Sequence, residues 1–243
     1  MMEVKQASGT RGPVGTMAPV ARALAVATAA LLAPALALAQ AAPTASVPAA
    51  SVPTASAGID IAAATSTRAL GSGNAPVTVE EYASYSCPHC AHFEESMLPR
   101  LKADFINPGQ VRFVFHDTPT NRVGYLAHMA TRCLPVASYN DARSLLFSTQ
   151  SQWLGAKDPE AGLKEMMGMA GLPGPAYDAC VASKPLQDYV ATSSQEATEA
   201  KIEVTPTLII RKGGKEVDRV AGPNDYDKLA AALIKAGAKA PKK

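Results

Sequence analysis

Cysteine is scarce in this sequence. Only four of the 243 residues are cysteines, and none precedes Cys87. A lipid anchor at a processed N-terminus would need a cysteine there, so lipid attachment of this kind is excluded. Thioether-linked haem requires the pattern C-x-x-C-H. Because Ala91 follows Cys90, covalent haem is excluded as well.

An excess of one charge is also missing. The chain has 23 Lys and Arg against 21 Asp and Glu, and without residues 1–39 each sign would number 20. A balanced chain argues against nucleic acid or an anionic membrane surface as a partner.

The longest apolar run, 23–38, has about 16 residues where a membrane-spanning helix needs about 20. Pro34 interrupts it as well, which argues against a membrane-spanning helix. We expect no stable membrane insertion of the mature chain, from which this run would be removed.

The N-terminal region has the three parts of a secretory signal peptide. Lys5, Arg11 and Arg22 precede the apolar run, which ends in the small-residue cleavage pattern Ala37-Leu38-Ala39. We therefore predict a signal peptide over residues 1–39, with translation starting at Met1, Met2 or Met17. The alternative is an uncleaved anchor. Export would place the mature protein in the periplasm of a Gram-negative bacterium, where disulfides persist.

Residues 40–75 are predicted to be a flexible linker. From residue 41 to about residue 58 the segment is built from Ala, Pro, Ser, Thr, Val and Gly, without charge or aromatic side chains. Such a composition buries too little apolar surface to offset the entropy of ordering. A short helix within 59–70 is a weaker expectation. Residues 76–243 then form one domain of ordinary size.

The domain alternates strand and helix patterns. Residues 77–82 and 111–115 are predicted strands, and a helix beginning at Cys87 has an apolar residue at every fourth position, with a kink expected at Pro99. Residues 122–198 carry helical patterns. Residues 208–220 fit a hairpin turning at Gly213-Gly214, and 226–233 fit a closing amphipathic helix. The order is β-α-β, a helical block, then β-β-α, which predicts an α/β fold.

The motif Cys87-Pro88-His89-Cys90 carries the predicted chemistry. Thiol–disulfide exchange needs an attacking thiolate and a second thiol that releases the mixed disulfide. At a helix N-terminus, unpaired backbone N–H groups and the helix dipole favour the thiolate of Cys87. Pro88 suits the first helical turn because it has no N–H to leave unpaired. His89 adds a further donor or positive charge beside the sulfur.

Other interpretations of the motif are weaker. Zinc needs about four ligands, and His89 and His92 lie too close along the chain to complete a tetrahedron with the two cysteines. A purely structural disulfide between Cys87 and Cys90 would be strained and easily reduced. We therefore expect no metal and no cofactor.

The chain resembles the DsbA-like bacterial thiol:disulfide oxidoreductases of the thioredoxin superfamily. The resemblance rests on PVTVEEY at 76–82, CPHCAHFEE at 87–95 and Val204-Thr205-Pro206-Thr207, and it extends over the domain. It implies a thioredoxin fold with a helical insertion at about 122–198. It further implies that Cys87 is the exposed nucleophile, Cys90 the resolving thiol and Pro206 a cis proline, with the Thr205 backbone pairing to substrate. The implied partners are reduced, unfolded exported proteins and a quinone-linked DsbB-like reoxidant in the membrane.

Two carboxyl groups are candidates for proton transfer with Cys90. Strand alternation places Glu81 on the same face as Val77 and Val79, and the resembling family often has a buried acid at this position. A carboxylate there would accept the proton of Cys90. Glu94, on the helix that begins at Cys87, is the second candidate. The alternative is that Glu80 and Glu81 are both solvated.

The identity of residue 205 bears on whether the protein is an oxidase, an isomerase or a reductase. The best-known oxidant of the resembling family has valine before the cis proline, while threonine is found in isomerase-type branches and other relatives. Residues 40–75 are too short for the dimerisation domain of an isomerase. An oxidase is therefore favoured over an isomerase or reductase. A secreted binding module that kept the fold would be expected to lack a cysteine, the proline or the acid, and none is missing.

Cys133 and Cys180 are the remaining cysteines. An even number in an oxidising compartment predicts that they form a structural disulfide within the helical insertion. Two separate buried thiols are the alternative.

Overall fold

The structure is a computed structural model that describes residues 59–241. The predicted signal peptide and residues 40–58 of the predicted linker lie outside the described residues. In the described part of the chain, no helix combines the length and the apolar character needed to cross a bilayer.

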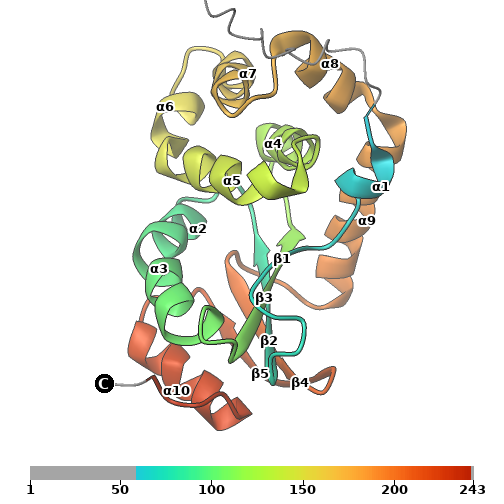
Figure 1. The fold of residues 1–243 in the computed structure, drawn as a ribbon. Helices are drawn as coiled ribbons and strands as arrows, with labels where there is room; N and C mark the ends of the chain where they lie inside the picture. Colours follow the sequence, from blue (N-terminus) through green and yellow to red (C-terminus); the bar gives the residue numbers. More distant parts are fainter. Residues whose placement is uncertain (1–58, 242–243) are drawn as a thin grey trace, which may run out of the picture. The chain divides into compact units, whose positions relative to one another are not determined.

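A five-stranded mixed sheet forms the centre of the fold (Figure 1). Strands β2 and β3 run parallel, and the other neighbouring pairs are antiparallel, in the order β1-β3-β2-β4-β5. The strands are β1 Arg68–Leu70, β2 Val77–Ala83, β3 Val111–Asp117, β4 Thr207–Lys212 and β5 Lys215–Ala221. Gly213 and Gly214 join β4 to β5 with φ of 55° and 79°, a conformation that glycine adopts without steric cost. The predicted strands and hairpin are confirmed.

The helix that follows the CPHC motif is continuous from 88 to 106 but not regular. It consists of α2 Pro88–His92, the π-helical turn η1 Phe93–Met97, α3 Leu98–Leu101 and a second π-helical turn η2 Lys102–Ile106. Pro99 cannot donate a backbone hydrogen bond, and its ring would crowd the carbonyl one turn before it. The wider turn η1 lies immediately before this position, with the Leu98 N–H bonded to the Phe93 carbonyl. The irregularity expected at Pro99 is therefore a π-helical bulge.

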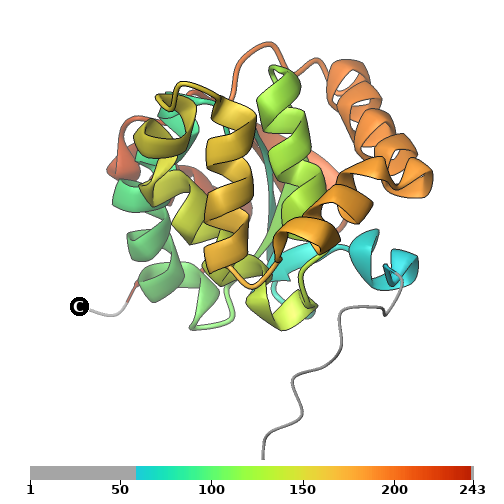
Figure 2. The same cartoon turned by 90° about the horizontal axis from the view of Figure 1, so that it is seen from above.

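Six helices occupy the region predicted as a helical insertion. They are α4 Arg122–Arg132, α5 Tyr139–Ser148, α6 Gln150–Leu154, α7 Pro159–Met169, α8 Gly174–Ala182 and α9 Lys184–Glu199, with a 3-10 turn η3 Val136–Ser138 before α5. Helices α4 to α8 lie beyond one end of the sheet (Figures 1 and 2). Helix α9 packs along one sheet face against β3, while α10 Tyr226–Ala236 packs against β4 and β5 on the other.

The domain begins earlier than predicted. Residues Ile61–Ala64 form the short helix α1, and Arg68–Leu70 form the edge strand β1, which pairs with β3 from Arg68 opposite Phe115 to Leu70 opposite Phe113. The predicted boundary at Pro76 is therefore wrong, whereas the short helix expected within 59–70 is present as α1. Arg68 is only 1% exposed, and its guanidinium donates to the Arg132 carbonyl at 3.1 Å, so long-range contacts order this segment.

The core divides between the sheet and the helical insertion. The apolar side chains spaced by four along the helix of residues 88–106 are all buried against the sheet: Phe93, Met97, Leu101 and Phe105. The second group of buried side chains lies among α4 to α9 and includes Cys90. The CPHC motif therefore lies where the sheet core meets the insertion.

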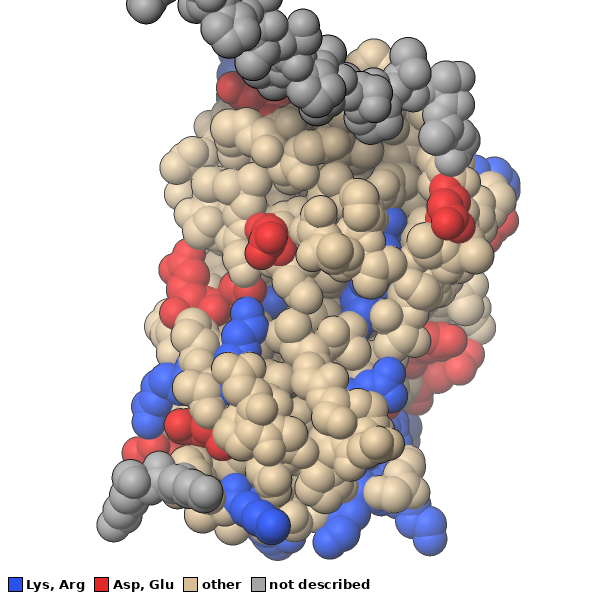
Figure 3. Space-filling view, viewed as in Figure 1, with Lys and Arg blue, Asp and Glu red and all other residues tan. Residues whose placement is uncertain are grey.

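Charged side chains of both signs are mixed over the face shown in Figure 3, with apolar and neutral surface between them. Lys and Arg gather toward the lower end of this view, below the sheet, away from the helical insertion. This mixture agrees with the near-neutral charge of residues 40–243.

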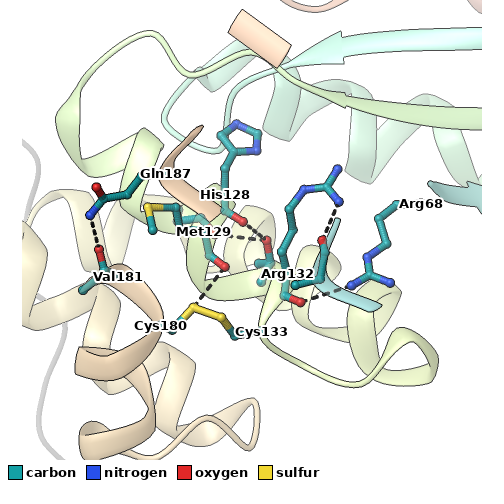
Figure 4. Close-up of a disulfide and its surroundings, with 11 residues drawn as sticks. Arg68, His128, Met129, Arg132, Cys133, Cys180, Val181 and Gln187 are labelled. Carbon is teal, nitrogen blue, oxygen red and sulfur yellow. Dashed lines mark hydrogen bonds between the residues drawn. A yellow bond between two sulfur atoms is a disulfide. The ribbon is translucent and has the colours of Figure 1, made fainter. Parts of the chain in front are cut away.

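A disulfide joins Cys133, directly after α4, to Cys180 in α8, with Cα atoms 6.2 Å apart (Figure 4). The bond connects segments separated by 47 residues. Closing so long a loop restricts the unfolded chain, which stabilises the fold. It ties α4 to α8, which pack against each other and against α7.

Thiol counting tests this disulfide. Denatured Cys87→Ser/Cys90→Ser protein, purified in air, is expected to contain no free thiol, because its two remaining cysteines are bonded to each other. Treatment with a reductant after denaturation should release both thiols, which serves as the positive control. Two free thiols without reductant would contradict the bridge.

Candidate active site

The two cysteines of the motif lie at the carboxyl end of β2. Cys87 is the N-cap residue of α2, Pro88 is its first residue, and both sulfurs are free thiols. Cys90 is completely buried, whereas Cys87 is half-buried. The Gln150 side chain donates to the carbonyls of Tyr85 at 2.7 Å and Cys87 at 3.0 Å, and so holds the loop between β2 and α2.

The environment separates the acidities of the two thiols. Hydrogen bonding from Cys90 lowers the pKa of Cys87 to about 5, against the effect of burial, with further donors from Thr205 and the backbone N–H groups of Cys90 and His89. Burial raises the pKa of Cys90, and the neighbouring sulfur and the charge of Glu81 add to the rise. Near neutral pH, Cys87 is therefore a thiolate and Cys90 a thiol that donates to it.

His89 acts on Cys87 differently from the prediction. Its backbone N–H contributes to the lowered pKa of Cys87, while its imidazole is exposed. His92 is exposed too and lies within hydrogen-bond distance of Ser96, at 3.3 Å. Among residues 59–241, no three His, Cys, Asp or Glu side chains are grouped closely enough to hold a metal ion.

Thr205 and Pro206 approach the motif from a distant part of the chain. The Thr205–Pro206 peptide bond is cis, and the Cys87 sulfur lies 3.2 Å from the Thr205 carbonyl oxygen. Pro206 is buried, and its carbonyl accepts from the Gly222 N–H at 2.9 Å. Thr205 remains half-buried beside the sulfur, so its backbone is positioned next to the group that would attack.

Glu81 and Glu94 share one arginine. Arg143 of α5, only 3% exposed, donates to Glu81 at 2.5 Å and also to Glu94. Its guanidinium packs over the Phe115 ring, 3.9 Å from the centroid. Burial raises the pKa of Glu81, and Arg143 opposes that rise. The solvated alternative for Glu81 is wrong: its side chain is fully buried, whereas Glu80 pairs with Arg211 at the sheet surface.

A second buried ion pair lies nearby. Asp117, at the end of β3, lies 2.7 Å from Nδ1 of His128 and also bonds Arg132, both on α4. Burial would raise the pKa of Asp117, but Arg132 and His128 outweigh it and lower this pKa to about 2. Asp117 is therefore ionised across the physiological range.

Sequence reasoning missed four polar residues of this region, namely Arg143, Gln150, Asp117 and His128. Arg143 and Gln150 lie on helices of the insertion whose apolar spacing gave no sign of a polar inward contact. Asp117 gave a weak signal, because polar residues that follow a buried parallel strand lie at the sheet edge where sites form.

Known proteins match this chain in sequence. The model of the family described as Thioredoxin matches residues 63–235. The "Putative protein-disulfide oxidoreductase" of Rickettsia felis is 24% identical over 157 residues, which cover 63% of this chain and 56% of that protein. The "Probable disulfide bond formation protein D" of Bacillus anthracis is 25% identical over 186 residues, covering 73% and 82%. The chain thus spans little more than half the length of the Rickettsia relatives.

Solved structures share the fold. The crystal structure of α-DsbA1 from Wolbachia pipientis matches with a TM-score of 0.64 at 21% identity, covering 70% of this chain and 90% of that one. At this identity the match speaks for the fold alone.

Proposed function

Because the chain belongs to the thioredoxin family and has a DsbA-like fold, we propose that it is a thiol–disulfide oxidoreductase that introduces disulfide bonds into exported proteins through Cys87 and Cys90. One observation carries the proposal. The half-buried sulfur with a pKa of about 5 lies at a helix N-terminus, hydrogen-bonded by a fully buried second thiol. This pairing supplies both a stable thiolate and a resolving thiol.

Exchange would proceed in two displacement steps. A client thiolate attacks the Cys87 sulfur of the Cys87–Cys90 disulfide, the bond breaks, and Cys90 leaves as a thiolate that takes up a proton. The second client thiolate then attacks the client sulfur of the mixed disulfide. Cys87 leaves as a thiolate, for which its low pKa makes it a good leaving group. The client is oxidised by two electrons, and the cysteine pair is reduced.

We assign the proton transfer with Cys90 to Glu81. Its charge raises the pKa of Cys90, and both side chains are fully buried, so the protonation of one affects the other. Protonated Glu81 gives its proton to the leaving Cys90 thiolate, and ionised Glu81 takes it back when Cys90 attacks during reoxidation. Glu94 instead accepts hydrogen bonds from Arg143 and from the hydroxyl of Ser144, the latter at 3.0 Å.

The client would bind beside the cis peptide bond. The backbone of Thr205 would pair with an extended client segment. The carbonyl oxygen of Thr205 lies 3.2 Å from the Cys87 sulfur, so a client bound there would be beside the reacting group. Pairing of this kind recognises backbone rather than sequence, which suits reduced, unfolded exported proteins as a class. Periplasmic location, following cleavage of the signal peptide, and reoxidation by a DsbB-like membrane protein complete the proposal.

An isomerase or reductase of the same fold is the second candidate. Thr205 before the cis proline favours it, because the resemblance associates threonine there with isomerase-type relatives. Both candidates use the same cysteines in the same steps. They differ in whether the disulfide or the dithiol is the more stable state, so a measurement of relative stability separates them.

The thiolate of Cys87 is expected to make the reduced protein more stable than the oxidised one by about 2 kcal/mol near pH 7. That pH lies about two units above the folded pKa of Cys87, and each unit corresponds to about 1.4 kcal/mol of stabilisation of the reduced form. Solvent screening at the half-buried sulfur reduces this total. A depressed folded pKa stabilises the reduced fold fully above the unfolded pKa of about 8.5, and this stabilisation disappears as pH falls through about 5.

Denaturant unfolding of both redox forms at about pH 7 and about pH 4 measures this difference. The reduced form should unfold at the higher denaturant concentration near pH 7, and the gap should shrink on acidification because the oxidised form has no thiolate. An oxidised form that is the more stable near pH 7 would contradict the oxidase and favour the reductase.

A further inference from the structure

A small cavity lies beneath the active site, between the ends of β2 and β3 and helices α4 and α5. It has a volume of about 10 Å³, and its lining includes the ion pair of Glu81 and Arg143 and the hydrogen-bonded pair of Asp117 and His128. A volume of this size corresponds to about one water molecule. A bound water needs at least two polar partners, so the polar atoms of the lining decide whether the site suits one.

Four buried polar atoms of the lining residues have no hydrogen-bond partner among residues 59–241. They are Oε1 of Glu81, the hydroxyl of Tyr85, Nε2 of His128 and Nε2 of His116. The Tyr85 hydroxyl also lies beside Thr131 and Tyr139, but without the geometry of a normal hydrogen bond. The side chains of Glu81, Tyr85 and His128 are at most 4% exposed, whereas His116 is half-buried. Buried polar atoms are costly to leave unpaired, so their common position at one water-sized cavity indicates a binding site.

The tautomer of His128 follows from its partner. Nδ1 of His128 lies 2.7 Å from Oδ1 of Asp117, which is ionised and can only accept a hydrogen bond. Nδ1 therefore carries a proton. In the neutral imidazole, Nε2 then has a free lone pair, and this buried atom has no hydrogen-bond partner among residues 59–241.

We propose that one water bound in this cavity links Glu81 to His128 and Tyr85, and that the Asp117–His128 pair is a second proton store for Cys90. The proposal rests on the exchange function proposed above. It gives Cys90 a path for its proton beyond Glu81, and it makes Asp117 and His128 positioning and relay residues rather than structural ones alone.

The proton balance of the relay is as follows. When Cys90 attacks, its S–H proton passes to the Glu81 carboxylate. The protonated Glu81 gives a proton to the water, the water gives one of its own to Nε2 of His128, and His128 becomes an imidazolium facing Asp117. Glu81 is thereby ionised again and regains its ion pair with Arg143. Without this step, Arg143 would keep only Glu94 as a partner for a buried cation, which is costly. When Cys90 leaves as a thiolate, every transfer reverses.

Other charged and titratable groups face His128 and set the charge it meets. Arg132 of α4 bonds Asp117 and packs over the Tyr189 ring of α9, at 4.4 Å from its centroid. The Tyr85 ring lies 4.7 Å from the His128 ring, centroid to centroid, at a tilt of 54°, and Tyr139, His116 and Arg143 also line the cavity. The relay variants below keep Arg132 with Asp117 and Arg143 with Glu81, while His128→Gln replaces the imidazole that bonds Asp117.

Reoxidation by oxidised glutathione separates the relay from other effects. The Cys87 thiolate first attacks glutathione disulfide in a second-order step, and Cys90 then closes the protein disulfide in a first-order step that requires loss of its proton. Tyr85→Phe and His128→Gln are expected to slow closure on the order of tenfold and to leave the first step unchanged. His92→Gln, an exposed histidine of the same helix as Cys90, is the matched control and should behave as the parent.

The outcomes distinguish the two proposals. If the parent does not react with glutathione disulfide, the exchange function fails. If it reacts and both variants close at the parent's rate, the relay is wrong while the function stands. A slowing of both steps together would indicate structural damage and also count against the relay. Should His128→Gln fail to fold, Tyr85→Phe decides. A high-resolution crystal structure supplies an independent test, because a water bonded to Glu81 and His128 is expected, and a dry cavity would overturn the proposal.

Discussion

Replacement of Cys90 by serine is expected to make the protein accumulate mixed disulfides with reduced client proteins. In this variant Cys87 still forms a bond with a client thiol, but the buried thiol that would displace the client is gone. Replacement of Cys87 by serine should give no mixed disulfide, because Cys90 is fully buried and burial raises its pKa. Catalysis of disulfide formation should be lost in both variants.

Non-reducing electrophoresis and mass spectrometry of the trapped species measure this difference. The Cys87→Ser/Cys90→Ser variant is the control, since its only cysteines are those of the Cys133–Cys180 bridge. Trapping by that control would show that the bridge exchanges with clients. Trapping by Cys87→Ser but not by Cys90→Ser would reverse the roles assigned to the two thiols.

Local patterns predicted most of the fold. The alternation in 77–82, the spacing of Phe93 to Phe105 and the Gly213-Gly214 turn each specify an element through short-range physics, and all three are present. The edge strand β1 was missed. Its three residues are too few for a pattern, and its order comes from pairing with β3 and from the buried contacts of Arg68.

The candidate site was predictable only in part. The thiols, the cis proline and Glu81 belong to short motifs, so their roles follow from helix-end chemistry, from strand alternation and from the family resemblance. Arg143 lies 62 residues beyond Glu81 and reaches it only because α5 packs over the helix of residues 88–106. Which arginine of the chain meets a buried acid is a property of tertiary packing, and one sequence holds no local sign of it.

Replacement of Arg143 by methionine is expected to destabilise the protein by about 3–5 kcal/mol. The guanidinium lies between Glu81 and Glu94, and its loss leaves two buried carboxyl groups without their cation. Arg143→Lys should recover part of the loss, because an ammonium keeps the charge but lacks the fork that reaches both acids. The exposed pair of Arg122 and Glu160 offers a matched control, and Arg122→Met should change the unfolding free energy little.

The pH dependence tests whether this loss is electrostatic. Burial raises the pKa of Glu81 and Arg143 opposes the rise, so removal of Arg143 raises this pKa further. A carboxyl group with a raised folded pKa is penalised once it ionises in the unfolded chain, and the penalty grows as pH increases from the unfolded pKa of about 4.3 to the folded pKa. Arg143→Met should therefore lose more stability at about pH 8 than at about pH 5, and its Cys90 closure should slow because Glu81 stays protonated. Equal losses at both pH values, with closure unchanged, would show that Arg143 contributes packing over Phe115 rather than charge beneath the active site.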